Sequence, residues 1–159
     1  MKNLILFTTK YGSVEKCGRI LAKELDGETE IVNLKTDSIP KLADYDKIIL
    51  GGSIYLGKTQ SAISKFAEEN IEALSSKKVG IYVNSGEPSE KKYVQIKNSF
   101  PAPIHDKAVA IGLFGDEITW EKCSFMDKLA LRLIKKVTAS YSNIDEKEIS
   151  RFAKLMNEA

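Results

Sequence analysis

Residues 8–14 read Thr-Thr-Lys-Tyr-Gly-Ser-Val and follow a short hydrophobic run, Leu4–Phe7. An amphipathic segment comes directly after them, so we expect this stretch to join a strand to the N-terminus of a helix. The unpaired N–H groups and the dipole at a helix N-terminus favour an anion. Hydroxyl groups can add hydrogen bonds, and a lysine can add charge. These residues therefore predict a phosphate cradle. Its candidate contacts are Thr9, Lys10, Tyr11, Gly12, Ser13 and Val14.

Two common types of phosphate loop do not match this stretch. A dinucleotide-binding loop needs the pattern G-x-G-x-x-G, and a P-loop ends in Gly-Lys-Ser or Gly-Lys-Thr. Residues 8–14 contain neither pattern. The common type that remains is a loop that holds the phosphate of FMN through amides and hydroxyls, without a required cation. The alternative is an ordinary polar turn in which Thr9 or Ser13 caps the helix.

Two later loops have residue types that suit the flat ring of a flavin. The hydrophobic run Lys47–Leu50 continues into a glycine-rich stretch, where Tyr55 and Leu56 can supply a surface for the ring. A later hydrophobic run ends in polar residues that can bind the edge of the ring. The candidate ring contacts are Ser53, Ile54, Tyr55, Leu56, Gly57, Asn84, Ser85 and Gly86. The alternatives are a glycine-rich turn with an exposed tyrosine, and a turn that only leads into a helix.

Hydrophobic runs alternate with helical patterns along the chain and must position these loops. The runs are Leu4–Phe7, Glu30–Val32, Lys47–Leu50, Val79–Val83 and Ala108–Phe114. This alternation is typical of an α/β protein. We predict a doubly wound sheet of five parallel strands in the order 2-1-3-4-5, between two helical layers. Ligands bind such a sheet at the carboxyl ends of its strands, where the strand order reverses, so the three loops should meet there.

Helical spacing of apolar residues predicts the helices that cover this sheet. They are expected over 14–25, 61–74, 90–98 and 145–157. Cys17 lies on the apolar face of the first helix, so we expect it in the core. Asp145 and Glu148 form a capping pattern at the start of the last helix.

One further helix, over 124–137, is more than a sheet of this order needs. Its apolar residues cover about half of the helical wheel, and Lys128, Arg132 and Lys135 lie opposite. A basic amphipathic helix can lie on an anionic membrane surface or dock a partner. Under this hypothesis the helix makes peripheral membrane contact near a redox partner. The alternative is that its apolar face packs on the body of the protein.

Length and composition restrict the possible functions. The 159 residues suit a single domain, and the net charge of +2 is too small to indicate nucleic-acid binding. No apolar run approaches the ~20 residues of a membrane span, and a strand within three residues of Met1 leaves no room for a signal peptide, so we expect a cytoplasmic protein. Cys17, Cys123 and the single histidine, His105, have no metal-binding spacing. The chemistry is therefore expected to come from a bound cofactor, with no catalytic side chain and no metal.

The chain resembles the flavodoxin family over nearly its whole length, through Thr9-x-x-Gly12-x-Val14 and Gly52-Ser53-Ile54-Tyr55. More narrowly, it is similar to the menaquinone-dependent protoporphyrinogen oxidase branch. The residues behind that likeness are 52–57, Ser61-Ala62, Val83-Asn84 and 125–133. The resemblance implies FMN, with phosphate contacts at 9–14 and ring contacts at 53–57 and 84–86. The family usually has threonine in place of Val14, which here leaves only the backbone amide, and soluble carriers of the family are typically more acidic than this chain.

We therefore predict a flavodoxin-like, FMN-binding electron-transfer protein or oxidoreductase. Its partner would be a redox protein or a quinone. Two alternatives remain. One is a quinone-linked enzyme similar to the protoporphyrinogen oxidases, and the other is an α/β interaction module that binds no flavin.

Overall fold

The computed structural model of the chain describes residues 1–55, 58–59, 61–86 and 89–159. In that part of the chain the central sheet has five parallel strands: β1 (Lys2–Phe7), β2 (Glu28–Asn33), β3 (Lys47–Tyr55), β5 (Lys78–Asn84) and β6 (Ala110–Leu113). Their order is β2-β1-β3-β5-β6. Counted among the parallel strands alone, this is the order 2-1-3-4-5, so the predicted fold class is confirmed.

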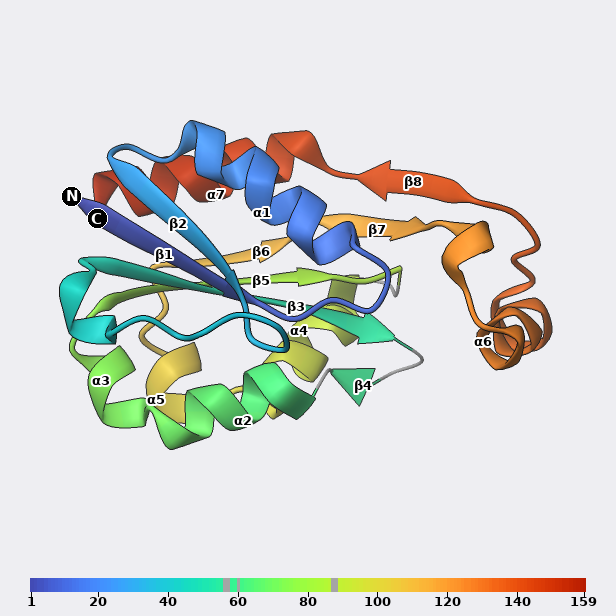
Figure 1. Cartoon of the computed structure of the whole chain (residues 1–159), viewed down its shortest axis with the longest axis horizontal. Helices are drawn as coiled ribbons and strands as arrows, with labels where there is room; N and C mark the ends of the chain where they lie inside the picture. The colour runs from blue at the N-terminus through green and yellow to red at the C-terminus, as the bar shows by residue number, and fades with distance from the viewer. Residues whose placement is uncertain (56–57, 60, 87–88) are drawn as a thin grey trace.

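Helices cover both faces of the sheet (Figure 1). On one face lie α1 (Ser13–Glu24) and α7 (Glu146–Glu158); on the other lie α2 (Ser61–Glu69), α3 (Ile71–Ser75), α4 (Ser89–Ser99) and α5 (Ala102–His105). A hydrophobic core lies on each face of the sheet. Alternate residues of β1 pack into the two cores, because successive side chains of a strand point to opposite faces. Ile5 packs beneath α1 and α7, whereas Leu4 packs on the other side. Within the described residues, no helix has the length and apolar character needed to cross a membrane.

Two predicted elements in the middle of the chain differ from the structure. The third strand continues to Tyr55 and pairs with the short antiparallel strand β4 (Lys58–Thr59), where we expected an open loop. This extension has a physical reason, since Ile54 is buried in the core and Ser53 pairs in register with Asn84 of β5. The helix expected over 61–74 is interrupted at Asn70, whose side-chain amide donates to the Phe66 carbonyl at 2.9 Å.

An antiparallel ribbon that we did not predict follows the last parallel strand. It consists of β7 (Gly115–Ile118) and β8 (Tyr141–Ile144). Gly115 has a φ of +80°, and a Cβ there would lie 1.9 Å from the Asn143 carbonyl oxygen, so the ribbon begins where only glycine fits. Between its strands lie a 3₁₀ turn (Trp120–Lys122), the helix α6 (Phe125–Ala130) and the π-helical turn η3 (Leu131–Lys135), in place of the continuous helix expected over 124–137.

The closing helix begins as its capping pattern indicated. The Asp145 side chain accepts a hydrogen bond from the Glu148 amide at 3.0 Å, and α7 follows it. One face of this helix buries Ile149, Phe152 and Met156 against the sheet. The cap thus starts the element that covers β6.

Tyr82 connects the centre of the sheet to the first turn of α1. Its ring is fully buried and stacks on Phe114, with ring centroids 4.8 Å apart. The hydroxyl donates to the Val14 carbonyl at 2.9 Å. A Cβ on Gly51 would lie 2.3 Å from Tyr82 Cζ, and one on Gly18 would lie 2.9 Å from the Tyr82 hydroxyl. The two glycines therefore make room for the ring that fixes the start of α1.

Cys17 lies in the core, as its helical position predicted. Its sulfur accepts a hydrogen bond from Asn84 Nδ2 at 3.2 Å. Burial raises the pKa of the Cys17 thiol to about 11, although the Asn84 hydrogen bond opposes part of that rise. The thiol therefore stays neutral in the folded protein at pH values where an exposed thiol is ionised.

We expect the protein to lose stability as the pH rises from about 9 to about 11 because of Cys17. In that window the unfolded chain releases the thiol proton and the folded chain keeps it, so the free energy of unfolding falls by up to about 1.4 kcal/mol per pH unit. Urea unfolding measured across this pH range should show a flatter dependence for Cys17→Ala than for the wild type. Equal slopes for both proteins would contradict the assignment.

Candidate functional site

A depression opens to solvent at the carboxyl ends of β1, β3 and β5, where the space not filled by atoms, open solvent included, is about 450 Å³. Its lining residues come from five segments that are distant in sequence. They are Lys10, Tyr11, Ser13, Ser53, Ile54, Asn84, Ser85, Gly86, Asp116, Glu117, Ile118 and Lys135. The three loops that the sequence singled out therefore converge on one place. This is the place that a doubly wound sheet offers to ligands.

Not every predicted contact residue lines this depression. Lys10, Tyr11, Ser13, Ser53, Ile54, Asn84, Ser85 and Gly86 do. Thr9, Gly12 and Val14 belong to the same loop and helix start but are not among the lining residues. Leu56 and Gly57 lie outside the described residues, as does the side chain of Tyr55, the last residue of β3.

The turn before α1 is shaped by a glycine and a threonine. Gly12 has a φ of +94° and is the N-cap residue of α1, with no side-chain cap. Its amide donates to Thr9 Oγ1 at 2.9 Å, so the threonine hydroxyl holds the turn. The first hydrogen bond of the helix runs from the Lys16 amide to the Gly12 carbonyl at 3.0 Å. The amides of Ser13 and Val14 lie ahead of it and have no acceptor within the helix.

Val14 points into the core and not into the depression. Its side chain is fully buried and belongs to the cluster that includes Phe7 and Cys17. A threonine side chain at this position would lie in that same apolar cluster. What Val14 offers to the start of the helix is its backbone amide.

Asn84 lines the depression and carries a buried polar atom that has no partner in the described part of the chain. The residue is 2% exposed, and its Nδ2 atom donates to Cys17 Sγ. Within the described residues, its Oδ1 atom has no hydrogen-bond partner, and neither has the hydroxyl of buried Thr8 at the end of β1. A buried acceptor left unpaired costs roughly 1–3 kcal/mol. A ligand that donates a hydrogen bond would satisfy Asn84.

The ribbon adds acidic residues that sequence reasoning missed. Asp116 accepts a hydrogen bond from the Tyr141 hydroxyl, and a Cβ on Gly86 would lie 2.4 Å from Asp116 Oδ2. Burial and this hydrogen bond together raise the pKa of Tyr141 well above its ordinary value. Glu117 pairs with Lys16 at 2.6 Å. Burial opposes ionisation of Glu117, but its hydrogen bonds to Lys16 and Ser142 outweigh burial and lower its pKa.

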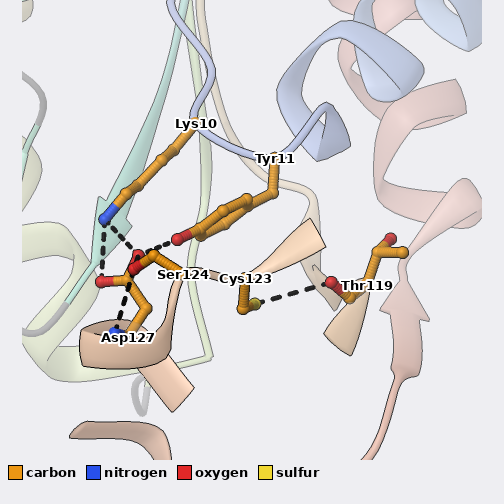
Figure 2. Close-up of polar contacts among 6 residues, drawn as sticks. All are labelled: Lys10, Tyr11, Thr119, Cys123, Ser124 and Asp127. Carbon is orange, nitrogen blue, oxygen red and sulfur yellow. Dashed lines mark hydrogen bonds and ion pairs between the residues drawn. The ribbon is translucent and has the colours of Figure 1, made fainter. Parts of the chain in front are cut away.

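Asp127 ties the loop before α1 to the start of α6 (Figure 2). Lys10 Nζ lies 2.7 Å from Asp127 Oδ2, and the Tyr11 hydroxyl donates to the same carboxylate. Ser124 donates to it at 2.8 Å and accepts from the Asp127 amide at 3.2 Å, which caps the helix. Nearby, Cys123 Sγ donates to the Thr119 carbonyl at 3.5 Å. The loop is thereby fixed against a segment more than a hundred residues away.

Comparison with known proteins gives consistent matches. Residues 4–145 match the family model described as a flavodoxin domain. Protoporphyrinogen IX dehydrogenase (quinone) of Escherichia coli K12 is 24% identical over 97% of this chain and 93% of its own length.

Solved structures show the same fold. Two-electron reduced flavodoxin from Megasphaera elsdenii has a TM-score of 0.63 at 13% identity and 99% coverage of both chains. Fusobacterium nucleatum flavodoxin bound to flavin mononucleotide has a TM-score of 0.54 at 12% identity, covering 99% of this chain and 97% of its own.

Proposed function

Because the chain belongs to the flavodoxin domain family, we propose that it binds FMN in the depression at the carboxyl ends of β1, β3 and β5 and works as an oxidoreductase. One observation carries this proposal. Ser13 at the N-terminus of α1 and Asn84, whose Oδ1 atom has no partner within the described residues, line one depression. A ligand that carries both an anion and a hydrogen-bond donor would satisfy both, and FMN carries both.

The phosphate would lie at the start of α1. Ser13 lines the depression there, and the backbone amides of Ser13 and Val14 have no acceptor within the helix. Lys10 is already paired with Asp127, so the amides and the Ser13 hydroxyl, more than a lysine, would hold the anion.

The ring would lie against the ends of β3 and β5. Ser53 and Ile54 line one side, and Ser85 and Gly86 the other. The ring edge of a flavin carries an N–H group that can donate to Asn84 Oδ1. Bound FMN supplies the electron-transfer chemistry, while the residues of the chain bind and orient it.

We further propose a quinone as the electron acceptor. The name of the Escherichia coli relative includes both a quinone and protoporphyrinogen IX, so protoporphyrinogen IX is the candidate donor here. A protein partner is the alternative acceptor, as expected of a simple carrier. Exposed apolar side chains in residues 125–134, which directly precede the lining residue Lys135, favour the quinone, because a quinone is an apolar partner.

Reoxidation of the loaded protein tests this function. The protein is incubated with FMN, freed of unbound flavin by gel filtration, and reduced with dithionite without oxygen. We expect added menadione to restore the visible absorption of oxidised flavin in proportion to the quinone. A reduced protein that menadione leaves unchanged, but that cytochrome c oxidises, would favour the carrier. Flavin that elutes apart from the protein would contradict the proposal altogether.

A further inference from the structure

The segment between β7 and β8 exposes a cluster of large apolar side chains. We call it the α6 patch: Phe125, Met126, Leu129, Leu133 and Ile134, which are 42–79% exposed. Leu131, in contrast, is fully buried with Ile118 and Cys123 and holds the segment to the body. The sequence left open whether this apolar face packs on the body of the protein. For these five residues it does not, and a group of large exposed apolar side chains on one short segment marks an interaction site.

Positive charge is concentrated around this patch. Residues 120–137 carry five basic and two acidic side chains, whereas the rest of the chain carries 19 basic and 20 acidic ones. One of the two acidic residues, Asp127, is engaged with Lys10. Lys128 and Arg132 lie over the ring of Trp120, with the charged groups 5.7 and 5.3 Å from its centroid. The cations are thereby held on the same short segment as the apolar side chains.

The patch lies at the end of the molecule where the depression opens. In Figure 1 the segment with α6 projects beyond the sheet on the side where β3 and β5 end. Lys135 lines the depression, and Ile134 of the patch is its neighbour in sequence. A surface that bound the patch would therefore face the candidate FMN site.

We propose that the α6 patch docks on an anionic lipid surface, with its apolar side chains among the acyl chains and its basic side chains at the headgroups. Long aliphatic and aromatic side chains flanked by lysine and arginine are the composition of interfacial helices. A second copy of this chain is a poorer occupant, because pairing two patches would bring like charges together. Docking rests on the proposed function only in that it would bring a lipid-soluble quinone near the flavin site.

Sedimentation with vesicles tests the proposal directly. The probes are vesicles of phosphatidylcholine alone and of equal parts phosphatidylcholine and phosphatidylglycerol. We expect the wild type to bind the anionic vesicles at least roughly tenfold more tightly than the neutral ones at low salt, since each basic side chain near an anionic membrane contributes to the attraction. Added salt should weaken the binding.

Two variants test whether vesicle binding depends on the α6 patch or on exposed apolar side chains in general. Phe125→Gln/Leu133→Gln removes two patch residues without changing charge, and should weaken binding to anionic vesicles by at least roughly tenfold. Ile39→Gln/Val94→Gln is the matched control, because Ile39 and Val94 are exposed apolar residues outside the patch. This control should bind as the wild type does. Equal thermal midpoints for both variants would establish that they are folded.

Three results would overturn lipid docking. They are a wild type that stays in the supernatant at low salt, a patch variant that binds as tightly as the wild type, and a dimer in analytical ultracentrifugation that the patch variant abolishes. The last would make a second copy the occupant. FMN content is measured in the same samples by absorption, so a failure to bind flavin and a failure to bind lipid are seen separately.

Discussion

Gly51→Ala should destabilise the protein more than any other single added methyl group in the centre of the sheet. The new Cβ would lie 2.3 Å from Tyr82 Cζ, 2.4 Å from its hydroxyl oxygen and 2.6 Å from Cε1, in a fully buried ring. The ring cannot move aside, because it stacks on Phe114 and its hydroxyl is bound to Val14. Overpacking typically costs about 1–3 kcal/mol, and we expect a loss of about 3 kcal/mol because three side-chain atoms of Tyr82 are affected. Urea unfolding gives the free energy directly.

Two variants identify the cause of that loss. Gly52→Ala is the matched control, since its Cβ would meet only the Ile63 methyl group at 3.2 Å, and we expect a smaller cost. Tyr82→Val removes the ring and is itself destabilising, but adding Gly51→Ala to it should cost little. If Gly51→Ala is as damaging in Tyr82→Val as in the wild type, the clash with the ring is not the reason.

Ser13→Asp should weaken FMN binding by roughly a hundredfold while leaving riboflavin binding nearly unchanged. Ser13 is the first residue of α1 and lines the depression, so the new carboxylate would stand beside the phosphate. Repulsion between charges about 4 Å apart near a protein surface amounts to roughly 4 kcal/mol, which is enough for this loss. Riboflavin has no phosphate and should not respond. The two affinities are measured by quenching of flavin fluorescence.

The aspartate is not expected to destabilise α1, because a negative charge in the first turn stabilises a helix. We therefore expect any loss of FMN binding to occur in a folded protein. Equal thermal midpoints for Ser13→Asp and the wild type would verify this. Ser13→Asn is the matched control, because asparagine has the size of aspartate but no charge. It should bind FMN much better than Ser13→Asp. A parallel loss of FMN and riboflavin in Ser13→Asp would mean that the phosphate lies elsewhere.

The sheet could be predicted because its strands are continuous Ile, Leu and Val runs, the pattern of strands buried on both faces. The convergence of the three loops then followed from strand order alone. Cys17 and the Asp145 cap were confirmed for a similar reason, since each depends on local spacing within one helix.

The ribbon was not predicted because its strands are stabilised by pairing between segments that are distant in sequence. Gly115–Ile118 and Tyr141–Ile144 are short, largely polar strands. In the described part of the chain, each pairs only with the other, across more than 20 residues. The acidic lining at Asp116 and Glu117 was missed with it. Gly115, directly after a hydrophobic run, was the one residue that indicated the end of the last parallel strand. The extent of β3 was also underestimated, because Gly51 and Gly52 suggested a turn, whereas Gly51 is there to accommodate Tyr82.

Exposure of the apolar face over 125–134 could not be decided from the sequence. The periodicity of an amphipathic helix is the same whether its apolar face packs on the protein or faces outward. Here Leu131 alone is fully buried, and the contacts of Asp127 and Trp120 hold the segment at its base. The exposed face is a consequence of those few anchors.

Titration of the flavin-free protein with FMN and, in parallel, with riboflavin tests the central claim most directly. Flavin fluorescence should be quenched until about one FMN is bound per chain, and riboflavin should bind at least roughly tenfold more weakly because it lacks the charged group that the α1 amides receive. Failure of FMN to saturate the protein at micromolar concentration would contradict the account. Equal affinity for the two flavins would contradict the phosphate site at the start of α1.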